Sequence, residues 1–253
     1  MKTLAVIPAR LGAVRLPRKP LRLLGGVPLV VRVWERVCDV AVADHCAIAT
    51  DSPEVAEVAR KHGADVVLTS DQHPSGTDRV AEAASAPQYA DFEIILNVQG
   101  DEPFVSAAAL RDAAALVTTA RFELGTVAAK GGPAALGLPD VVKVVADDEG
   151  RAMYFSRAGI PFLRDRSDAV LLDDRIWHHL GVYAYTRGAL MKWVALPPHP
   201  LEQIERLEQL RPLAAGMAMG VALVDEPRRG GIDTEDDLAQ ANSDWTTFIT
   251  GPR

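Results

Sequence analysis

A basic loop follows the first apolar run of the chain. The loop carries four cationic residues within a stretch of ten: Arg10, Arg15, Arg18 and Lys19. Arginine presents a planar fork to phosphate oxygens and lysine a compact point charge, while a glycine at position 12 would let the backbone approach an anion. Because the whole protein carries a net charge of −7, this local concentration of positive charge indicates a phosphate-binding loop. A solvated basic loop is the alternative, and the segment matches neither a Walker A motif nor G-x-G-x-x-G.

Two acidic residues stand where a hard cation could bind. Asp101 follows the apolar run that ends at Val98, in the segment NVQGDEP, and Asp233 comes just before a helix start at Thr234. Mg²⁺ in proteins takes one or two carboxylates together with waters and phosphate oxygens. Within its segment Asp101 is the better ligand, because Glu102 precedes a proline. The alternatives are a turn or N-cap acid for the first residue and an acid on the helix dipole for the second.

A third polar segment opens a helix and reads Ser75-Gly76-Thr77-Asp78-Arg79. Backbone amides at a helix start bind anions or carbonyl oxygens. Together with two hydroxyls and a glycine they suit recognition of a base edge. Ordinary helix capping is the alternative interpretation.

The second half of the chain carries two further groups of polar residues. His178, His179, Tyr183 and Tyr185 accompany an expected strand, on which adjacent histidines point to opposite faces, and this argues against a zinc pair. Residues 201–210 are amphipathic, so we expect one helix whose apolar stripe packs against a neighbour. The stripe consists of Leu201, Ile204, Leu207 and Leu210.

Hydrophobic periodicity predicts the elements that position these groups. Apolar runs typical of buried strands occur at 3–7, 46–49, 65–68, 93–98 and 124–128. Helices are expected at 29–37, at 53–63 with Ser52 as N-cap, at 77–86 and at 107–119. This alternation predicts an α/β fold with a mostly parallel sheet and helices on both faces. Such sheets bind ligands at the carboxyl ends of their strands, so we expect chemistry in the loops after residues 7, 49, 68 and 98.

The pattern changes after about residue 130, at Gly131-Gly132-Pro133. Less regular strands are expected at 141–145 and 180–185. The main pattern then returns with a strand at 221–224 and a helix at 234–241, with Thr234 as N-cap and Asp237 at the third helical position. We therefore expect one domain over residues 1–253 with an insertion or subdomain over roughly 130–215.

Composition and charge exclude several classes of protein. The 253 residues are 48% hydrophobic and 24% charged, which excludes wholesale disorder. The negative net charge argues against a sequence-independent nucleic-acid binder, and no apolar run approaches the roughly 20 residues of a membrane span. Cys38 and Cys46 lack the C-x-x-C spacing, so neither a disulfide framework nor a zinc cluster is expected. We expect a cytoplasmic protein without nucleic-acid or membrane partners.

Taken in order, several segments resemble the 3-deoxy-manno-octulosonate cytidylyltransferases, also called CMP-Kdo synthetases. They span residues 5 to 238: IPARLGAVRLPRKPL, ATDS, HPSGTDRVAEA, NVQGDEPF, DVVKVV, AMYFSRAGIP, HHLGVYAY, LEQIERLEQLR and GIDTEDDL. The resemblance implies a Rossmann-like nucleotidyltransferase sheet with an inserted region that binds the sugar and forms a homodimer. It implies CTP and the acidic eight-carbon sugar Kdo as substrates and Mg²⁺ as cofactor. The implied products are pyrophosphate and CMP-Kdo, for lipopolysaccharide-type glycan synthesis.

The resemblance also implies roles for individual residues. The catalytic set is Arg10, Arg15, Lys19, Asp101 and Asp233, of which the two aspartates hold the metal. The nucleotide-binding set is Ala9, Arg10, Gly12, Arg15, Lys19, Ser75, Gly76, Thr77, Arg79 and Gln99. The sugar-binding set is Gln99, Arg157, His179, Tyr185, Glu208 and Gln209. In this last set Arg157 suits the sugar carboxylate.

One departure from the family pattern is Ala13-Val14, where the family usually has Ser-Thr, so the phosphate loop lacks two hydroxyls. One alternative is a cytidylyltransferase for a related acidic sugar, such as 8-amino-Kdo, another ulosonic acid or a sialic-type acid; the sugar segments disfavour the last. A second is a non-catalytic nucleotide-binding homologue, against which the presence of both Asp101 and Asp233 counts. A third is a Rossmann-like oxidoreductase, against which the missing glycine fingerprint counts.

Overall fold

The chain folds into two compact units. The computed structural model describes residues 1–12, 15–172, 174–224 and 230–250. The first unit comprises residues 1–107 and 229–253, and the second comprises residues 108–228. The boundaries expected near residues 130 and 215 both lie inside the second unit. Among the described residues, no helix combines the length and apolarity that crossing a bilayer requires.

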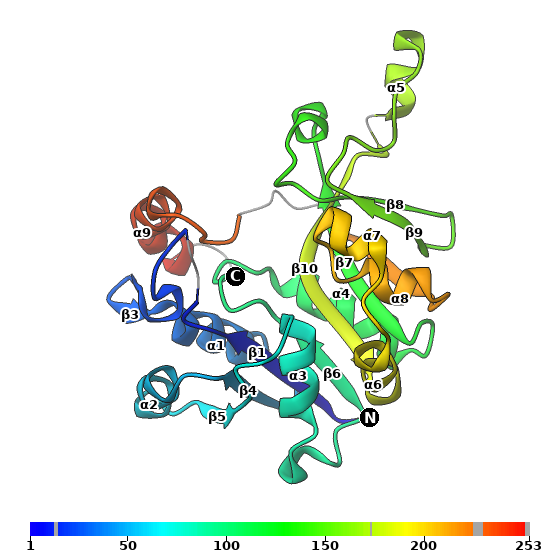
Figure 1. The fold of residues 1–253 in the computed structure, drawn as a ribbon. Coiled ribbons are helices and arrows are strands. Elements are labelled where there is room, and N and C mark those ends of the chain that lie inside the picture. Colours follow the sequence, from blue (N-terminus) through cyan, green and yellow to red (C-terminus); the bar gives the residue numbers. More distant parts are fainter. Residues whose placement is uncertain (13–14, 173, 225–229, 251–253) are drawn as a thin grey trace. The chain divides into compact units, whose positions relative to one another are not determined.

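Four parallel strands form the sheet of the first unit, in the order β6-β1-β4-β5 (Figure 1). They are β1 (Thr3–Ala9), β4 (His45–Thr50), β5 (Asp65–Leu68) and β6 (Ile94–Asn97). Each coincides with a predicted apolar run, and residues 4–7 of β1 and 94–96 of β6 have no exposed surface. Burial on both faces is the reason that parallel strands are continuously apolar in sequence. The predicted α/β class with a mostly parallel sheet is confirmed.

Helices connect these strands close to the predicted bounds. They are α1 (Leu29–Val40), α2 (Pro53–Lys61) and α3 (Gly76–Ala84). The Ser52 hydroxyl accepts a hydrogen bond from the backbone N–H of Val55 at 3.3 Å, so Ser52 is the N-cap of α2, as predicted. Ser75 is the N-cap of α3, which therefore begins one residue earlier than the sequence indicates.

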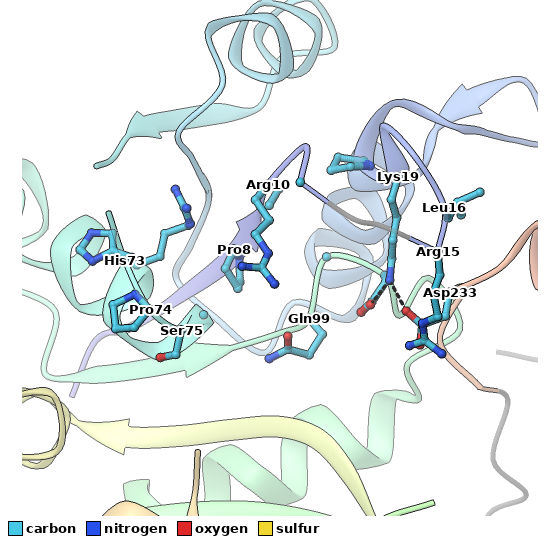
Figure 2. Close-up of a pocket in the computed structure, with 17 residues that line it drawn as sticks. Pro8, Arg10, Arg15, Leu16, Lys19, His73, Pro74, Ser75, Gln99 and Asp233 are labelled. Atoms are coloured by element: carbon cyan, nitrogen blue, oxygen red, sulfur yellow. Dashed lines mark hydrogen bonds and ion pairs between the residues drawn. The ribbon is translucent and has the colours of Figure 1, made fainter. Parts of the chain in front are cut away.

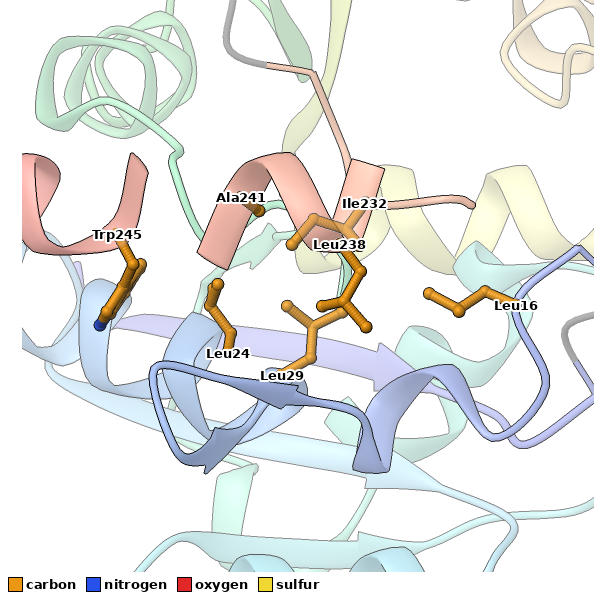
Figure 3. Packing of buried hydrophobic residues seen from close by; sticks show 7 residues of the cluster. All are labelled: Leu16, Leu24, Leu29, Ile232, Leu238, Ala241 and Trp245. Carbon is orange, nitrogen blue, oxygen red and sulfur yellow. The ribbon is translucent and has the colours of Figure 1, made fainter. Parts of the chain in front are cut away.

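The C-terminal helix α9 (Glu235–Thr250) packs against the N-terminal segment of the same unit. It lies beside a short hairpin of β2 (Leu23–Leu24) and β3 (Val27–Pro28), where the Asn242 amide donates to the Leu23 carbonyl at 3.1 Å. Figure 3 shows the apolar cluster between them: Leu16, Leu24, Leu29, Ile232, Leu238, Ala241 and Trp245. Leu16 belongs to the basic loop and Ile232 directly precedes Asp233. One buried cluster therefore anchors two segments that carry candidate site residues.

The second unit contains a mixed sheet. Its strands are β7 (Leu124–Lys130), β8 (Lys143–Ala146), β9 (Ala152–Ser156), β10 (Trp177–Thr186) and β11 (Met219–Val224). β7 pairs in parallel with β11 and antiparallel with β10, while β8 pairs antiparallel with both β10 and β9. The helices are α4 (Ala107–Thr118), α5 (Ala169–Leu172), α6 (Arg187–Ala195), α7 (Pro200–Glu205) and α8 (Leu210–Ala214). The sequence predicts neither β9 nor α6.

The single helix predicted over residues 201–210 is wrong. The structure has the short helix α7, which ends at Arg206 in the left-handed conformation with φ of 54°, and a separate helix α8 that begins at Leu210. The apolar stripe is split as well, because Leu207 is buried whereas Ile204 is 77% exposed. An ion pair joins the two helices across this break. The Arg211 guanidinium donates to both carboxylate oxygens of Glu202, at 2.8 and 2.5 Å.

Candidate active site

A cleft of about 420 Å³ opens in the first unit at the carboxyl ends of β1 and β6. The basic loop after β1, the N-terminus of α3, the loop after β6 and Asp233 all contribute to its walls (Figure 2). The lining residues are Pro8, Ala9, Arg10, Gly12, Arg15, Leu16, Lys19, Pro20, His73, Pro74, Ser75, Gly76, Arg79, Gln99, Gly100, Asp101 and Asp233. The position agrees with the rule that α/β sheets bind ligands beyond the carboxyl ends of their strands.

Asp101 and Asp233 come from distant parts of the chain and are brought together by the backbone. The N–H of Ile232 donates to the Asp101 carbonyl at 3.0 Å, so the segment before α9 runs alongside the loop after β6. Gly100 permits this loop to lie close to β1, because a Cβ at that position would stand 2.7 Å from the Pro8 carbonyl oxygen. The structure therefore brings both acids, which the family resemblance assigns to one metal, to the same cleft.

The two carboxylates converge on the ammonium of Lys19, which belongs to a single 3₁₀ turn (Lys19–Leu21). Lys19 Nζ donates to Asp101 Oδ2 and, at 2.6 Å, to Asp233 Oδ1. Arg15 Nη2 donates to the other oxygen of Asp233 at 2.9 Å. Burial by itself lowers the pKa of Lys19, but Asp101 and Asp233 outweigh burial, so the pKa is raised and the ammonium stays charged.

The main chain at Asp233 is fixed by the start of α9. The Asp237 carboxylate accepts from the N–H of Asp233 at 3.0 Å and from that of Thr234 at 2.8 Å. In return the Thr234 hydroxyl accepts from the N–H of Asp237 at 3.1 Å. This reciprocal capping confirms the predicted roles of Thr234 and Asp237. It leaves the Asp233 carboxylate to face the cleft.

The start of α3 forms the opposite wall. The Ser75 hydroxyl donates to the Asp78 carboxylate at 2.6 Å and accepts from the Asp78 N–H at 3.3 Å. Arg79 is buried and donates to the Thr69 hydroxyl at 2.5 Å and to Asp51 at 3.1 Å, so it ties together the loops after β4 and β5 while lining the cleft. Thr77 is 1% exposed and is the one member of the expected nucleotide set that is absent from the lining residues described.

The remaining expected nucleotide residues lie between these two walls. In Figure 2 the side chains of Arg10 and Gln99 stand between His73 and Ser75 on one side and the Lys19–Asp233 contact on the other. Ala9 and Gly12 line the same space. The departure at positions 13 and 14, Ala13-Val14, lies outside the described residues.

The expected sugar residues other than Gln99 belong to the second unit, where three of them surround Tyr183. The ring of Tyr183 lies 5.3 Å from that of His179 and 6.1 Å from that of Tyr185. Burial, together with the nearby carboxylate of Glu208, raises the pKa of Tyr183. Tyr185 is fully buried, and its ring also packs edge-on against Trp193.

A hydrogen bond orients the imidazole of His179. The Thr126 hydroxyl donates to the Val182 carbonyl at 2.7 Å and lies 2.9 Å from His179 Nε2. This contact fixes the position of the His179 ring beside β7. The other two expected sugar residues differ in exposure: Gln209 is 2% exposed, whereas Arg157 is partly exposed.

The donors in the cleft fit a divalent cation bound together with phosphate. No cluster of three or more His, Cys, Asp and Glu side chains that could hold a metal occurs among the described residues. Two carboxylates on loops are the usual protein share of a Mg²⁺ site whose other ligands are waters and phosphate oxygens. Asp101 and Asp233 both contact the Lys19 ammonium, so the two carboxylates share one positive charge.

Several residues of these sites are missing from the expected nucleotide and sugar sets. Pro8, His73 and Pro74 line the cleft, and Tyr183 lies at the centre of the aromatic group of the second unit. His73 and Pro74 open the motif HPSGTDRVAEA, so their membership of that motif was the available signal. Thr126 could be found only from the antiparallel pairing of β7 with β10, which sequence spacing does not reveal.

Comparisons with known proteins agree over nearly the whole chain. The family model described as Cytidylyltransferase matches residues 4–219. The 3-deoxy-manno-octulosonate cytidylyltransferase of Gemmatimonas aurantiaca is 61% identical over 245 residues, which cover 97% of this chain and 95% of that protein. The protein of the same name from Stenotrophomonas maltophilia is 44% identical, with 94% of each chain covered. The structure of CMP:2-keto-3-deoxy-manno-octonic acid synthetase complexed with CTP gives a TM-score of 0.89 at 33% identity and covers 98% of this chain and 99% of that chain.

Proposed function

The chain belongs to the 3-deoxy-manno-octulosonate cytidylyltransferase family, and we propose that it transfers CMP from CTP to the anomeric hydroxyl of Kdo. The hydroxyl oxygen attacks the α-phosphorus, the bond from that phosphorus to the β-phosphate breaks, and pyrophosphate leaves with the bonding electrons. The observation that carries the proposal is the convergence of Arg15, Lys19, Asp101 and Asp233 in one cleft beside a helix N-terminus.

The basic loop supplies the charge that a leaving pyrophosphate needs. Arg10, Arg15 and Lys19 line the cleft, and negative charge accumulates on the leaving group as the bond breaks. Preorganised cations at that place stabilise the transition state more than the ground state, and this difference accelerates the reaction. Arg15 and Lys19 each pair with a carboxylate of the same cleft, which places both cations at its wall.

Asp101 and Asp233 are the residues that would hold Mg²⁺. Bound there with the phosphates, Mg²⁺ would neutralise phosphate charge and favour ionisation of the attacking hydroxyl. Once the triphosphate attracts Lys19, the two carboxylates lose the ammonium that they share in this structure. The chain thus provides both the carboxylates and a cation that can move from them to the substrate.

Base and sugar selection fall to different residues. The helix start at Ser75 and Gly76 offers backbone N–H groups for the edge of cytosine, with Gln99 nearby in the cleft. We propose that Arg157 binds the sugar carboxylate and that His179, Tyr185, Glu208 and Gln209 bind its hydroxyls. This set contains one cation, one acid and neutral hydrogen-bonding groups, which suits an acidic polyol better than a sugar phosphate.

We also propose that the protein acts as a homodimer in the cytoplasm and supplies CMP-Kdo for lipopolysaccharide-type glycan synthesis. Phe162, Val170 and Leu171 of the second unit are 83%, 76% and 69% exposed, as expected of side chains that a second copy would cover. Cys38 and Cys46 are free thiols, which fits a reducing compartment.

Pyrophosphate release tests the proposal. Wild-type protein is mixed with CTP and Mg²⁺ and offered Kdo, 8-amino-Kdo, a sialic acid or glucose-1-phosphate. We expect turnover with Kdo that depends on Mg²⁺, little with the sialic acid and none with glucose-1-phosphate. Faster turnover of 8-amino-Kdo would reassign the sugar within the same reaction. CTP binding without turnover of any ulosonic acid would favour a non-catalytic nucleotide-binding protein.

A further inference from the structure

Arg157 lies directly after β9, and Glu205 of α7 holds its main chain. Oε2 of Glu205 accepts from the Arg157 N–H at 3.0 Å, and Oε1 accepts from the Ser156 hydroxyl at 2.6 Å. The carbonyl of Glu205 accepts from Arg157 Nε at 2.8 Å. Glu205 therefore orients both the backbone and the side chain of Arg157.

A buried lysine binds the main-chain carbonyl of the same residue. Lys143 of β8 is 0% exposed, and its ammonium donates to three carbonyls: those of Leu138 at 3.0 Å, Val141 at 2.5 Å and Arg157 at 2.6 Å. Burial and the nearby Arg157 lower the pKa of Lys143, while Glu205 acts in the opposite direction. The N–H and the C=O of Arg157 are thus each bound by a charged side chain.

These contacts orient the guanidinium without neutralising it. Nε and Nη1 of Arg157 donate to the carbonyls of Glu205 and Pro139, at 2.8 and 3.1 Å, and no carboxylate pairs with this guanidinium among the described residues. The Glu205 carboxylate is directed at the main chain instead. Two cations and one carboxylate leave one positive charge in the group. A ligand carboxylate would balance that charge and could accept from the N–H groups of Nη2.

We propose that Glu205 and Lys143 are positioning residues for Arg157 and thereby set the affinity of the protein for the sugar carboxylate. The inference rests on the proposed function, because it takes the carboxylate of an acidic sugar as the ligand of Arg157. It goes beyond that function by assigning a role to two residues that need not touch the substrate. Preorganisation of this kind lowers the free-energy cost of fixing the side chain on binding.

The primary test is the variant Glu205→Gln, measured by pyrophosphate release with Kdo and CTP varied separately. An amide can accept through only one atom, so either Ser156 or the Arg157 N–H loses its acceptor. We expect the KM for Kdo to rise about tenfold, in line with the loss of one hydrogen bond to a charged group, while the KM for CTP changes less than about twofold. Equal increases of both KM values would overturn the proposal, since they would indicate a general structural role.

A double-mutant cycle separates positioning from folding. In an Arg157→Met background we expect Glu205→Gln to leave the KM for Kdo unchanged, because the residue through which it acts is absent. If the two substitutions raised the KM for Kdo independently, so that their factors multiplied and their free energies added, the proposal would be overturned. Lys143→Met should also raise the KM for Kdo, and only while Arg157 is present. If replacing the buried Lys143 prevents folding, Glu205→Gln alone provides the test.

Glu202→Gln is the matched control on the same helix. Glu202 pairs with Arg211 rather than with Arg157, so this variant should lower thermal stability and leave the KM for Kdo near the wild-type value. A rise as large as that of Glu205→Gln would contradict the inference. Absence of wild-type turnover would instead defeat the proposed function itself, whereas normal turnover with an additive cycle would defeat only the positioning role.

Discussion

Lys19 and Asp233 lie 214 positions apart in the chain, yet Nζ of Lys19 is 2.6 Å from Oδ1 of Asp233. The same ammonium contacts Asp101, so three segments of the first unit meet at one charge. Lys19 is largely buried, with 13% of its side chain exposed, and a partly buried ion pair is weakened less by solvent than a surface pair. The contact therefore orders the cleft and at the same time occupies the carboxylates that a metal would need.

Removing either carboxylate should stop the reaction and spare the fold. We expect Asp101→Asn and Asp233→Asn each to lower kcat at least about a hundredfold, as is usual when a group that stabilises transition-state charge is lost. Thermal unfolding should change by only a few degrees, because Lys19 keeps one carboxylate partner in each variant. Pyrophosphate release at limiting Mg²⁺ measures the first effect, and near-normal rates in both variants would contradict a shared metal.

Lys19 should compete with a divalent cation while nucleotide is absent. Mn²⁺, which takes the same oxygen ligands as Mg²⁺ and is visible by electron paramagnetic resonance, can be titrated into the nucleotide-free protein. We expect Lys19→Gln to bind Mn²⁺ about tenfold more tightly than wild type, equivalent to about 1.4 kcal/mol.

Arg22→Gln is the matched control for this titration. It removes an ion pair with Glu235, which follows Asp233 by two residues but is 61% exposed. Because this pair includes neither Asp101 nor Asp233, Mn²⁺ affinity should stay unchanged. An affinity in Lys19→Gln equal to that of wild type would show that the ammonium does not compete with the metal.

Gly100 should tolerate no side chain. A Cβ there would stand 2.7 Å from the Pro8 carbonyl oxygen, so Gly100→Ala must displace the loop that carries Asp101. We expect the free energy of unfolding to fall by about 1–3 kcal/mol, together with a loss of kcat. Gly188→Ala in α6, where a Cβ meets nothing within 4 Å, should be neutral or slightly stabilising. Equal stability of the two variants in urea titrations would contradict the close approach.

Acid should weaken the ion pair between Glu202 and Arg211, which joins α7 to α8. Burial alone raises the pKa of Glu202, but hydrogen bonds from Arg211 and from the His199 backbone outweigh burial and hold the pKa below its usual 4.5. A lowered pKa contributes stability above the unfolded-state value that is lost as pH falls through the folded-state value. The difference in unfolding free energy between wild type and Glu202→Gln should therefore shrink from pH 6 to pH 3. A constant difference across that range would contradict this assignment.

Local signals account for the elements that the sequence predicts well. The run at 3–7 is buried on both faces and Ser52 caps its helix by a bond to Val55, so each can be identified from neighbouring residues. Residues 201–210 fail for the opposite reason. No glycine or proline marks the left-handed Arg206, and the break is held by Arg211 reaching back to Glu202, a contact that helical periodicity does not encode.

In the site, too, local sequence predicts some features, whereas others depend on contacts between distant residues. Sequence alone places Asp101 after a strand and Asp233 before a helix, but their meeting depends on the hydrogen bond from Ile232 to the Asp101 carbonyl. Family resemblance, and not periodicity, assigns Arg157 to the sugar. Neither source indicates that Lys143 and Glu205 hold its peptide, because those contacts join β8, β9 and α7 through side chains.

The central claim is that CMP moves from CTP to the anomeric oxygen of an ulosonic acid. Phosphorus NMR of a mixture of wild-type protein, CTP, Mg²⁺ and Kdo labelled with ¹³C at the anomeric carbon tests it directly. We predict that the triphosphate signals give way to pyrophosphate and to a phosphodiester signal coupled to the labelled carbon, and that UTP with glucose-1-phosphate gives no change. Formation of free CMP without the carbon coupling, or comparable turnover of UTP with glucose-1-phosphate, would contradict the account.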